Sequence, residues 1–426
     1  MIDEIVAEAR VRLDLCLDAE DELRRKAEAD LLFAFAEDPE DQWEPQTLKN
    51  RGDRPCYSYN RLGQAIDQVI NDQRQQRPQI KVRPVDSVTD PALADVHNGL
   101  IRNIEEQSDA ESVYDDGFMY TVSGGFGYWR VINEYTDDKS FDQDLFIRPV
   151  QSQFSVYMDP AAQHVTKRDA NWAILSVWID KDEFKAQYGE DKLKDFEGIN
   201  DDRSEQWVEE SQVRVAEYYR KTYETRELLE LSDGQIVYRD EVSEILDDLE
   251  AEGVTVERSR TVKEAQIEWR KISGAGVIEG PIVERGCQWI PIIRDCGKRI
   301  VIDNRERVKG MTRDAKDAQR SYNYMRSDIA EDVLMKPKAP YFVPDTTIEN
   351  ESYRKIWGVA HKVLMNYLPF MADPTLPGGG APIPNTATGM DPGKLTVAQQ
   401  DILDIQATKY GAFGFIRTSS AMSERM

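Results

Sequence analysis

The pattern of apolar and polar residues predicts a long helix from Thr312 to Met335, followed by the proline-rich exit KPKAPYFVP. Thr312 is a residue type that caps helices, and Pro337 prevents continuation. At about 1.5 Å per residue, this helix would be about 36 Å long. It is too long and too polar for an ordinary core, so we expect it to pack beside copies of itself or beside another helix of its own chain. The apolar side chains recur mostly at steps of three and four, on one stripe: Ala315, Ala318, Tyr322, Met325 and Ile329.

The residues before position 124 are predicted to be largely helical. Apolar periodicity indicates helices from Ile2 to Glu37, from Asn60 to Gln76 and from Asp90 or Pro91 to about Val122. We expect a loop from Asp38 to Tyr59, and IKVRPV after the second helix alternates as a short strand.

The middle of the chain, from about Gly124 to Val308, alternates in the manner of β-strands. Glycines in GGFGYWRVINEY indicate a tight turn from a helix into a strand. Short helices are expected at Lys181 to Tyr188 and at Glu241 to Glu252, and VRVAEYYRKTYETRELLEL with QIVYR indicates a hairpin. This pattern predicts an α+β body made mainly of antiparallel sheet.

The segment from Tyr341 to Pro392 is rich in proline and glycine, which predicts a loop-dominated region with one short strand at HKVLMNYL. Apolar periodicity returns from Lys394 to Tyr410 and predicts another helix.

Length and charge limit the classes of function. A chain of 426 residues is long enough for two or three domains, each with its own core. It carries 54 basic and 79 acidic residues, a net charge of −25. Phosphate binding needs clustered Lys and Arg, so this composition argues against gripping nucleic acid through a general basic surface.

Cysteine, membrane and targeting signals indicate a cytosol-like compartment. Cys16, Cys56, Cys287 and Cys296 are widely spaced and form no CxxC pair, so they are interpreted as reduced thiols. No apolar run reaches the roughly 18 residues of a membrane span, and the first residues, MIDEIVAEAR, are acidic where a signal peptide would be basic.

The sequence offers little enzyme chemistry. GGFG at Gly124 precedes a strand, whereas a phosphate-binding loop precedes a helix. The carboxylates of Asp144, Asp159, Asp169 and Asp303 could converge on a metal, although proximity by chance is equally expected among so many acidic residues. The other candidates are three isolated histidines (His97, His164 and His361), and six aromatic residues in strand patterns that we interpret as core or interface packing: Tyr128, Trp129, Trp172, Trp178, Tyr218 and Tyr219. We therefore expect a non-enzymatic assembly protein without cofactor or metal.

Several motifs in order resemble phage portal proteins, most closely those of short-tailed, podovirus-type phages. The long helix predicted from Thr312 to Met335, which we call the rod, contains DAQR (Asp317 to Arg320), NYM (Asn323 to Met325) and Ser327, followed by KPKAPYFVP. Upstream lie NRLGQAIDQVINDQRQQRPQIKVRPV, GGFGYWRV, VYMDP, KRDANWAI, VAEYYRK, WRKISGAGVIEG and WIPIIR, and Gly310 precedes the rod. The resemblance covers about residues 15 to 410.

This resemblance implies a ring, normally of twelve subunits, at one vertex of an icosahedral capsid. Such a ring is the channel for packaging and ejection of double-stranded DNA, which passes without sequence specificity. The implied partners are further copies of the chain, the major capsid and scaffolding proteins, the large terminase subunit, and later tail or adaptor proteins. The implied location is the virion, after assembly in the host cytoplasm.

The family architecture maps onto the chain as six segments. It implies a wing made of a helical part (1–123) and a sheet-rich part (124–308), a first stem helix (309–335), a clip (336–393), a second stem helix (394–412) and the start of the tunnel-loop region (413–426). The family continues into a channel-lining helix and a crown, so the resemblance implies a truncated chain.

The resemblance also gives roles to individual residues. The apolar stripe of the rod would pack between subunits. Five cations are candidates for DNA contacts, or alternatively for salt bridges between subunits: Arg313, Arg320, Arg326, Lys336 and Lys338. Four clip aromatics would contact terminase and tail proteins, or pack between clips: Tyr341, Phe342, Trp357 and Tyr367.

Two rival functions stay open. One is another virion structural protein: a scaffold, which should be mostly helical, or an adaptor, which is usually much shorter. The other is an enzyme of nucleic-acid or cell-wall processing that depends on carboxylates and a metal, which predicts several carboxylates meeting in one pocket.

Overall fold

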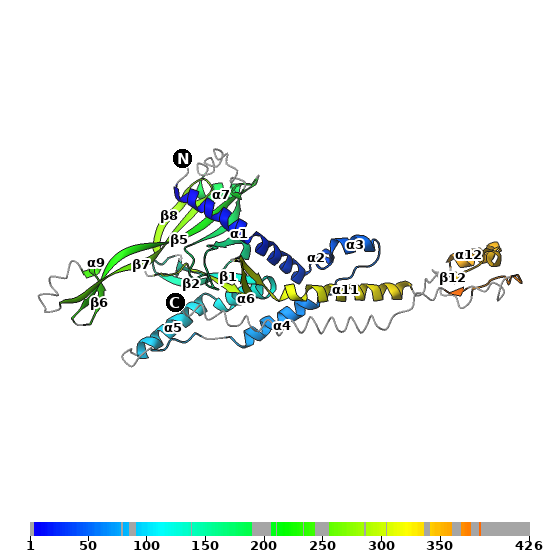
Figure 1. The fold of residues 1–426 in the computed structure, drawn as a ribbon, viewed down its shortest axis with the longest axis horizontal. Helices are drawn as coiled ribbons and strands as arrows, with labels where there is room; N and C mark the ends of the chain where they lie inside the picture. The colour runs from blue at the N-terminus through cyan, green and yellow to red at the C-terminus, as the bar shows by residue number, and fades with distance from the viewer. Residues whose placement is uncertain are drawn as a thin grey trace. The chain divides into compact units, whose positions relative to one another are not determined.

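A computed structural model of the chain describes residues 4–77, 80–84, 91–137, 139–189, 206–209, 211–232, 234–242, 255–284, 287–303, 305–335, 341–359, 368–375 and 383–384 (Figure 1). The chain divides into two compact units. Among the described residues, the first unit contains 4–31 and 69–311, and we call it the sheet unit. The second contains 32–68 and the residues from 312 onward, and we call it the helix unit.

The sheet unit contains two main antiparallel sheets, as the sequence predicted for residues 124–308. One has three strands in the order β2-β1-β9, and the other has six, in the order β3-β4-β5-β7-β8 with β6 paired to β5. The first sheet contains β1 (Phe126–Tyr135), β2 (Gln143–Pro149) and β9 (Ile292–Cys296). The second contains β3 (Val156–Met158), β4 (Trp172–Asp180), β5 (Gln212–Leu231), β6 (Ile236–Tyr238), β7 (Val256–Ser273) and β8 (Val277–Glu284). The α+β class is confirmed.

The first helix, α1 (Glu4–Phe35), covers one face of the six-stranded sheet. Successive side chains of a strand point to opposite faces, so Trp172 and Ile174 of β4 join the core beneath α1. Their neighbours Ala173 and Leu175 join the core on the other face. Both faces are therefore buried, which explains why NWAILSVWID has an almost continuous apolar run.

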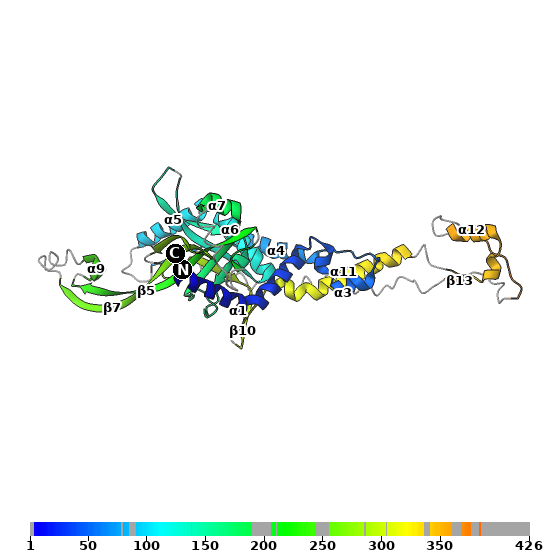
Figure 2. The same ribbon diagram turned by 90° about the horizontal axis from the view of Figure 1, so that it is seen from above.

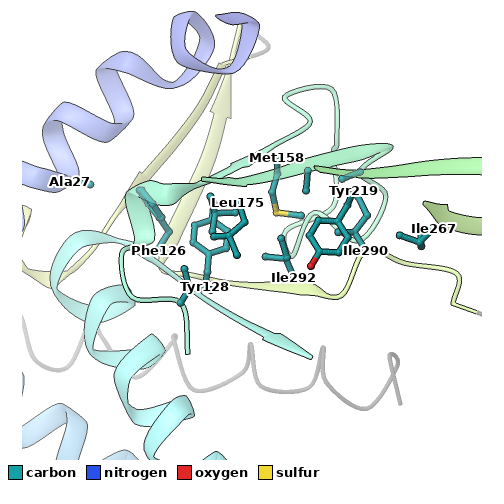
Figure 3. Packing of buried hydrophobic residues seen from close by; sticks show 13 residues of the cluster. Ala27, Phe126, Tyr128, Met158, Leu175, Tyr219, Ile267, Ile290 and Ile292 are labelled. Atoms are coloured by element: carbon teal, nitrogen blue, oxygen red, sulfur yellow. The ribbon is translucent and has the colours of Figure 1, made fainter. Parts of the chain in front are cut away.

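The three-stranded sheet covers the second face of the six-stranded sheet. Its side chains Phe126, Tyr128 and Ile292 share one buried cluster with Met158 and Tyr219 (Figure 3). The opposite face of the three-stranded sheet packs under α5 (Pro91–Gln107) and α6 (Ala110–Gly124). The sheet unit thus has four layers: α1, the six-stranded sheet, the three-stranded sheet, and α5 with α6.

The aromatic residues interpreted as core from sequence are mostly buried. Tyr128, Trp129, Trp172, Tyr218 and Tyr219 are at most 5% exposed, which confirms their packing role. Trp178 is half-buried, with the guanidinium of Arg214 centred 4.5 Å from its ring.

Strands β5 and β7 pair along most of their length and form a long ribbon (Figure 1). The hairpin predicted from the sequence corresponds to the pairing of β5 with β6. The remaining elements of the sheet unit are short. They are η1 (Gln153–Ser155), α7 (Lys181–Tyr188), α9 (Arg239–Val242), β10 (Lys298–Ile302) and β11 (Arg305–Lys309). α7 confirms the expected helix, whereas most of the one expected at Glu241 to Glu252 lies outside the described residues.

Three local predictions were wrong. The helix expected up to Val122 is broken between α5 and α6, because Asp109 adopts a left-handed conformation with φ 47°. Residues 80–84 form no strand, although their polarity alternates. The loop expected at Asp38 to Tyr59 contains two short helices, each with a proline at its start: α2 (Pro39–Gln42) and α3 (Pro45–Arg51).

Glycines allow α6 and the chain entering the long helix to approach closely. Gly125 ends α6 in a left-handed conformation with φ 109° and begins the turn into β1, which confirms the helix-to-strand turn. A Cβ atom on Gly310 would lie 2.7 Å from the carbonyl oxygen of Ser123 and still closer to that of Val122. The backbone just before the long helix is therefore packed against the end of α6.

The helix unit is built on α11 (Met311–Met335), which confirms the predicted rod. Its other described elements are α2, α3, the first part of α4 (Arg61–Gln75), β12 (Tyr341–Phe342), η5 (Asp345–Ile348), α12 (Glu351–Val359) and β13 (Ile383–Pro384). The expected helix at Lys394 to Tyr410, and all but the last residue of the strand expected at HKVLMNYL, lie outside the described residues. None of the described helices combines the length and the apolarity that crossing a membrane requires.

Candidate functional site

One face of α11 is polar and yet buried. Gln319, Asn323 and Ser327 are at most 1% exposed and follow one another at steps of four, which places them in one row on the helix. We call this row the polar ladder. A buried amide or hydroxyl without hydrogen bonds is costly, so each of these side chains needs partners.

The polar ladder binds the extended segment before α4. Ser327 Oγ accepts a hydrogen bond from the backbone N–H of Tyr57 at 2.9 Å. Asn323 Oδ1 accepts from the N–H of Tyr59 at 3.0 Å. Gln319 Oε1 accepts from the N–H of Arg61 at 3.1 Å and from that of Leu62 at 3.2 Å, and its Nε2 donates to the carbonyl of Tyr59 at 2.7 Å.

The spacing of these contacts follows from the geometry of the two backbones. Four residues of helix rise by about 6 Å, and two residues of extended chain span about 6.6 Å. Every fourth residue of α11 can therefore reach every second residue of an extended segment that runs antiparallel to it. Gln42 completes the row, because its Oε1 accepts from Asn323 Nδ2 at 2.8 Å.

The apolar stripe predicted for α11 divides into two groups. Ala315 and Tyr322 are fully buried within the chain, and the ring of Tyr322 lies edge-on to that of Tyr59 with centroids 6.5 Å apart. Ala318, Met325 and Ile329 are only half-buried. Packing between subunits stays a prediction, and it now rests on these three side chains.

The arginines of α11 contact their own chain. Arg320 Nη1 lies 3.1 Å from Glu44 Oε1, and its guanidinium is centred 5.5 Å from the ring of Phe33. The guanidinium of Arg326 lies 5.7 Å from the rings of both Tyr59 and Tyr322. Arg313 is half-buried, and Lys336 and Lys338 lie outside the described residues. A DNA contact by any of these cations stays a prediction.

The predicted clip residues are only partly described. Tyr341 and Phe342 form β12, which pairs with Pro384 and Ile383 of β13. Trp357 on α12 is half-buried and donates a hydrogen bond from Nε1 to the carbonyl of Pro369 at 2.8 Å. The positions of the Tyr341 and Phe342 side chains, and the whole of Tyr367, lie outside the described residues.

The carboxylates considered for metal chemistry serve separate local structures where they are described. Asp159 accepts hydrogen bonds from the Ala161 N–H at 2.9 Å and from Asn171, while Asp169 accepts from the Gln163 N–H at 2.7 Å. Asp144 lies in β2, and Asp303 lies in the turn after β10 with φ 51°. Within the described part of the chain, no three side chains of His, Cys, Asp or Glu are grouped so as to hold a metal.

The histidines and cysteines form no constellation in the described parts of the chain. His97 is exposed on α5, and Nδ1 of His164 lies 2.8 Å from Thr166 Oγ1. His361 lies outside the described residues. All four cysteines lie in the described part of the chain, and no disulfide joins any two of them. Burial raises the pKa of the Cys16 thiol well above its usual range and also raises that of Cys296, so neither thiol is activated.

Two largely buried glutamates of the sheet unit, Glu20 and Glu306, are paired with cations. Glu20 lies 2.8 Å from Arg24 and 3.3 Å from Lys167, and Glu306 lies 3.0 Å from Arg294. Burial alone would raise the pKa of both glutamates, but the neighbouring cations outweigh it and hold each pKa below its usual value. The arrangement is typical of a structural network, in which each buried charge compensates another.

The members of the polar ladder lie in or beside the motifs DAQR and NYM, to which the sequence alone assigned no role. Their spacing of four residues is visible in the sequence. Two amide side chains on the same face of a helix could have indicated a row of hydrogen-bonding groups. The partner segment, 57–61, carries no comparable signal, because its contacts are made by backbone atoms.

Comparison with known proteins finds a matching family and a curated relative. The family model described as "Phage P22-like portal protein" matches residues 10–411. A curated protein named "Portal protein", from Acyrthosiphon pisum secondary endosymbiont phage 1, is 28% identical over 350 residues, which cover 79% of this chain and 48% of that protein. The chain therefore spans about half the length of this curated relative.

Proposed function

Since the chain belongs to the phage P22-like family of portal proteins, we propose that it is one subunit of a ring at a single vertex of a phage capsid. The ring, normally of twelve copies in portal proteins, encloses the channel through which double-stranded DNA enters during packaging and leaves during ejection. The observation that carries this proposal is the family match, which extends over α11 and its polar ladder.

The division of α11 into two sides supports lateral packing. One side is saturated by the hydrogen bonds of its own chain, through Gln319 and Asn323. The half-buried side carries Ala318, Met325 and Ile329, which are small or apolar and can pack against the corresponding helix of a neighbour. Repeating one such contact around an axis gives a closed ring.

The net charge of −25 supports a conduit. DNA must slide through a portal, and an acidic wall repels phosphates where a basic wall would hold them. Local phosphate contacts by Arg313, Arg320, Arg326, Lys336 and Lys338 are compatible with this general repulsion.

We assign the wing to residues 1–308, the stem helices to 309–335 and 394–412, the clip to 336–393, and the start of the tunnel-loop region to 413–426. In this assignment the clip, with Tyr341, Phe342, Trp357 and Tyr367, binds the large terminase subunit and later the tail or adaptor proteins. The wing contacts the major capsid and scaffolding proteins. Assembly takes place in the host cytoplasm, and the mature location is the capsid vertex.

The rival functions are less well supported. A scaffolding protein should be mostly helical, whereas this chain has two antiparallel sheets in its middle. A metal-dependent enzyme should bring several carboxylates together, and Asp159 and Asp169 are each engaged by the backbone of their own loop. A structural, non-enzymatic role therefore fits the described residues best.

Electron microscopy of the purified protein in negative stain tests the proposal. We expect rings with a central hole, and a class-average symmetry near twelvefold. Ala318→Asp and Met325→Asp should abolish ring formation, because each places a charge on the side of α11 that meets a neighbour. Asp317→Asn, at a fully exposed position of the same helix, is the matched control and should assemble normally. Monomers or open filaments of the wild-type protein at every salt concentration would contradict the proposed ring.

A further inference from the structure

The hairpin of β10 and β11 projects from the sheet unit (Figure 2). Its register pairs Lys298 with Lys309, Ile300 with Arg307, and Ile302 with Arg305. Paired residues share one face of a hairpin, and alternate pairs share the same face, so this face carries two isoleucines and four cations. We call it the basic face. The stretch from Lys298 to Lys309 has five basic and two acidic residues in a chain with a net charge of −25.

The opposite face of the hairpin is fixed to the sheet unit. Val308 is 3% exposed, and Glu306 pairs with both Arg294 and Arg299. Arg299 also donates from Nη2 to the carbonyl of Gln163 at 2.9 Å. The hairpin is therefore anchored to the sheet unit through this opposite face. On the basic face, Ile300, Ile302, Arg305 and Arg307 are exposed.

The basic face exposes apolar surface together with charge. Ile300 is 58% exposed and Ile302 is 46% exposed. No carboxylate of the described residues lies within ion-pair distance of Arg305 or Arg307. The pKa of Glu22 is lowered mainly by Lys26, and Arg307 makes a smaller contribution to the same shift. Exposed isoleucines beside arginines indicate a partner surface that is both apolar and acidic.

The turn between β1 and β2 has the complementary character. From Glu134 to Leu145 the sequence contains five acidic residues and one lysine. Tyr135 is 59% exposed, Phe141 96% and Leu145 42%. We call this turn the acidic tip. At its base, the N–H of Thr136 donates a hydrogen bond to the carbonyl of Asp142 at 3.0 Å.

The acidic tip also holds like charges together. Glu134 lies directly opposite Asp144 in the register of β1 and β2, and like charges in this position are destabilising. Arg148 neutralises Glu134 at 2.6 Å, whereas Asp137, Asp142 and Asp144 form no ion pair with any described residue. Cations from another surface would relieve this repulsion.

The two surfaces lie at opposite ends of one sheet. β10 follows directly on β9, whose last residue, Cys296, pairs with Phe126 at the start of β1. The acidic tip begins at the other end of β1, where Tyr135 pairs with Gln143. Nine residue steps of about 3.3 Å separate these ends by about 30 Å. The two surfaces accordingly lie on different sides of the sheet unit, with β10 on one side and the teal β1–β2 turn on the other (Figure 2).

We propose that the basic face of the β10–β11 hairpin binds the acidic tip of a second copy of this chain. The isoleucines pack against Phe141 and Leu145, and Arg305 and Arg307 pair with the aspartates of the tip. Two different surfaces on opposite sides of one subunit make a heterologous contact, which repeats from copy to copy and closes into a ring. The proposal rests on the proposed ring, because it assigns one contact between its subunits.

Disulfide trapping tests the contact directly. In the full chain with Cys56→Ser and Cys287→Ser, the pair Ile300→Cys and Phe141→Cys should give a ladder of covalent oligomers on mild oxidation. Bridged Cα atoms must lie within about 7 Å, so this pair cannot close within one chain. Either cysteine alone should give dimers at most. Tyr223→Cys, at another exposed position, combined with Phe141→Cys is the matched control and should give no ladder.

Charge reversal provides the second test. Arg305→Glu with Arg307→Glu should raise the concentration needed for assembly by about tenfold or more, since like charges then face each other. Asp142→Arg with Asp144→Arg should do the same, and the combination of all four should restore assembly. Arg258→Glu with Arg260→Glu makes the same change of charge on β7 and should have little effect. Far-ultraviolet circular dichroism and thermal unfolding check that each variant folds.

The outcomes separate this contact from the proposed function. Rings that form normally in the hairpin variants, without a disulfide ladder, would refute the contact and leave the ring standing. A ladder from the Ile300→Cys, Phe141→Cys variant, combined with a wild-type protein that forms no closed oligomer, would support the contact and refute the ring. Loss of duplex-DNA binding in the hairpin variants, with unchanged assembly, would overturn the proposal and assign the basic face to nucleic acid.

Discussion

The Nε2 of Gln319 donates a hydrogen bond to Oδ1 of Asn323 at 3.0 Å, one helical turn further along α11. The same Asn323 oxygen accepts the backbone N–H of Tyr59 at 3.0 Å. Each amide is thereby fixed in one orientation, with the Gln319 oxygen left to accept the N–H groups at the start of α4. The two side chains act as one unit that ties the rod to a segment about 260 residues earlier in the chain.

Gln319→Ala should destabilise the helix unit by about 2 kcal/mol. The substitution removes this partner from the buried N–H of Leu62 and from the part-buried N–H of Arg61 and carbonyl of Tyr59. An unsatisfied buried group costs about 1–3 kcal/mol, and the part-buried groups cost less because water can reach them. Urea unfolding measures the change in free energy. Asn323→Ala should cost a similar amount, and the double variant less than the sum, because the two side chains share one network.

Hydrogen exchange of individual backbone amides tests each hydrogen bond of the polar ladder separately. The amides of Arg61 and Leu62 should exchange faster in Gln319→Ala, that of Tyr59 in Asn323→Ala, and that of Tyr57 in Ser327→Ala. Asp317→Ala, which changes a fully exposed side chain on the same helix, should alter none of them. Equal acceleration at all four amides in every variant would argue against separate contacts.

Gly310→Ala should prevent normal folding or cost more than about 3 kcal/mol. The new Cβ would overlap the backbone carbonyls of Val122 and Ser123, which end α6 and cannot move aside as a flexible side chain would. Gly99→Ala is the matched control, because a Cβ there meets open space on α5. Alanine favours a helix over glycine, so this control should gain up to about 1 kcal/mol in thermal or urea unfolding. Similar stability of the two variants would refute the close approach at Gly310.

Elements with strong local signals could be predicted from the sequence. The rod, the first helix and α7 have clear periodicity and end signals, and their predicted bounds agree with the structure to within a few residues. The antiparallel body was predicted because its strands alternate or form continuous apolar runs between turn residues. The break between α5 and α6 was not predicted, because the residue at the break is Asp109 and not the glycine or proline that usually marks one.

The arrangement of the candidate site could be predicted only in part. Periodicity predicted a single apolar stripe on α11. It could not distinguish Ala315 and Tyr322, which are buried within their own chain, from Ala318 and Met325, which are half-buried. That distinction depends on segment 57–61, which lies far away in sequence and contributes backbone atoms. Buried polar side chains such as Gln319 also contradict the simple rule that polar positions face water.

Asp295→Asn should stabilise the chain at neutral pH and have little effect in acid. Burial raises the pKa of Asp295 to about 6, although a hydrogen bond from Trp129 opposes the shift. A raised pKa means that the folded chain favours the protonated form. The resulting stability is fully present below the pKa of an unfolded aspartate, about 3.9, and is lost as pH rises through about 6.

The variant lacks this titration and should exceed the wild type by about 1–2 kcal/mol at pH 7.5, with the difference vanishing near pH 4. Urea unfolding at several pH values measures it. Asp317→Asn, at a fully exposed position, should show no such pH dependence. A constant difference across pH for Asp295→Asn would exclude its titration as the cause.

Glu306→Gln should destabilise the sheet unit by about 3 kcal/mol at neutral pH. Arg294, which is 2% exposed, would lose the charge that compensates it, and a buried charge without compensation typically costs this much. Burial acts to raise the pKa of Glu306, but Arg294 and Lys167 outweigh it, so the net pKa is lowered. The stabilisation is therefore present above the pKa of an unfolded glutamate, about 4.3, and is lost as pH falls through the lower folded value.

The difference in unfolding free energy between wild type and Glu306→Gln should accordingly shrink on acidification below about pH 4. Glu279→Gln, which changes an exposed partner of Lys271 at 3.9 Å, is the matched control and should cost less than about 0.5 kcal/mol. Glu306 also fixes the β10–β11 hairpin to the sheet unit through Arg299, so its loss should weaken assembly at protein concentrations where the wild type still forms oligomers. A variant that is destabilised but assembles at wild-type concentrations would show that the hairpin does not need this anchor.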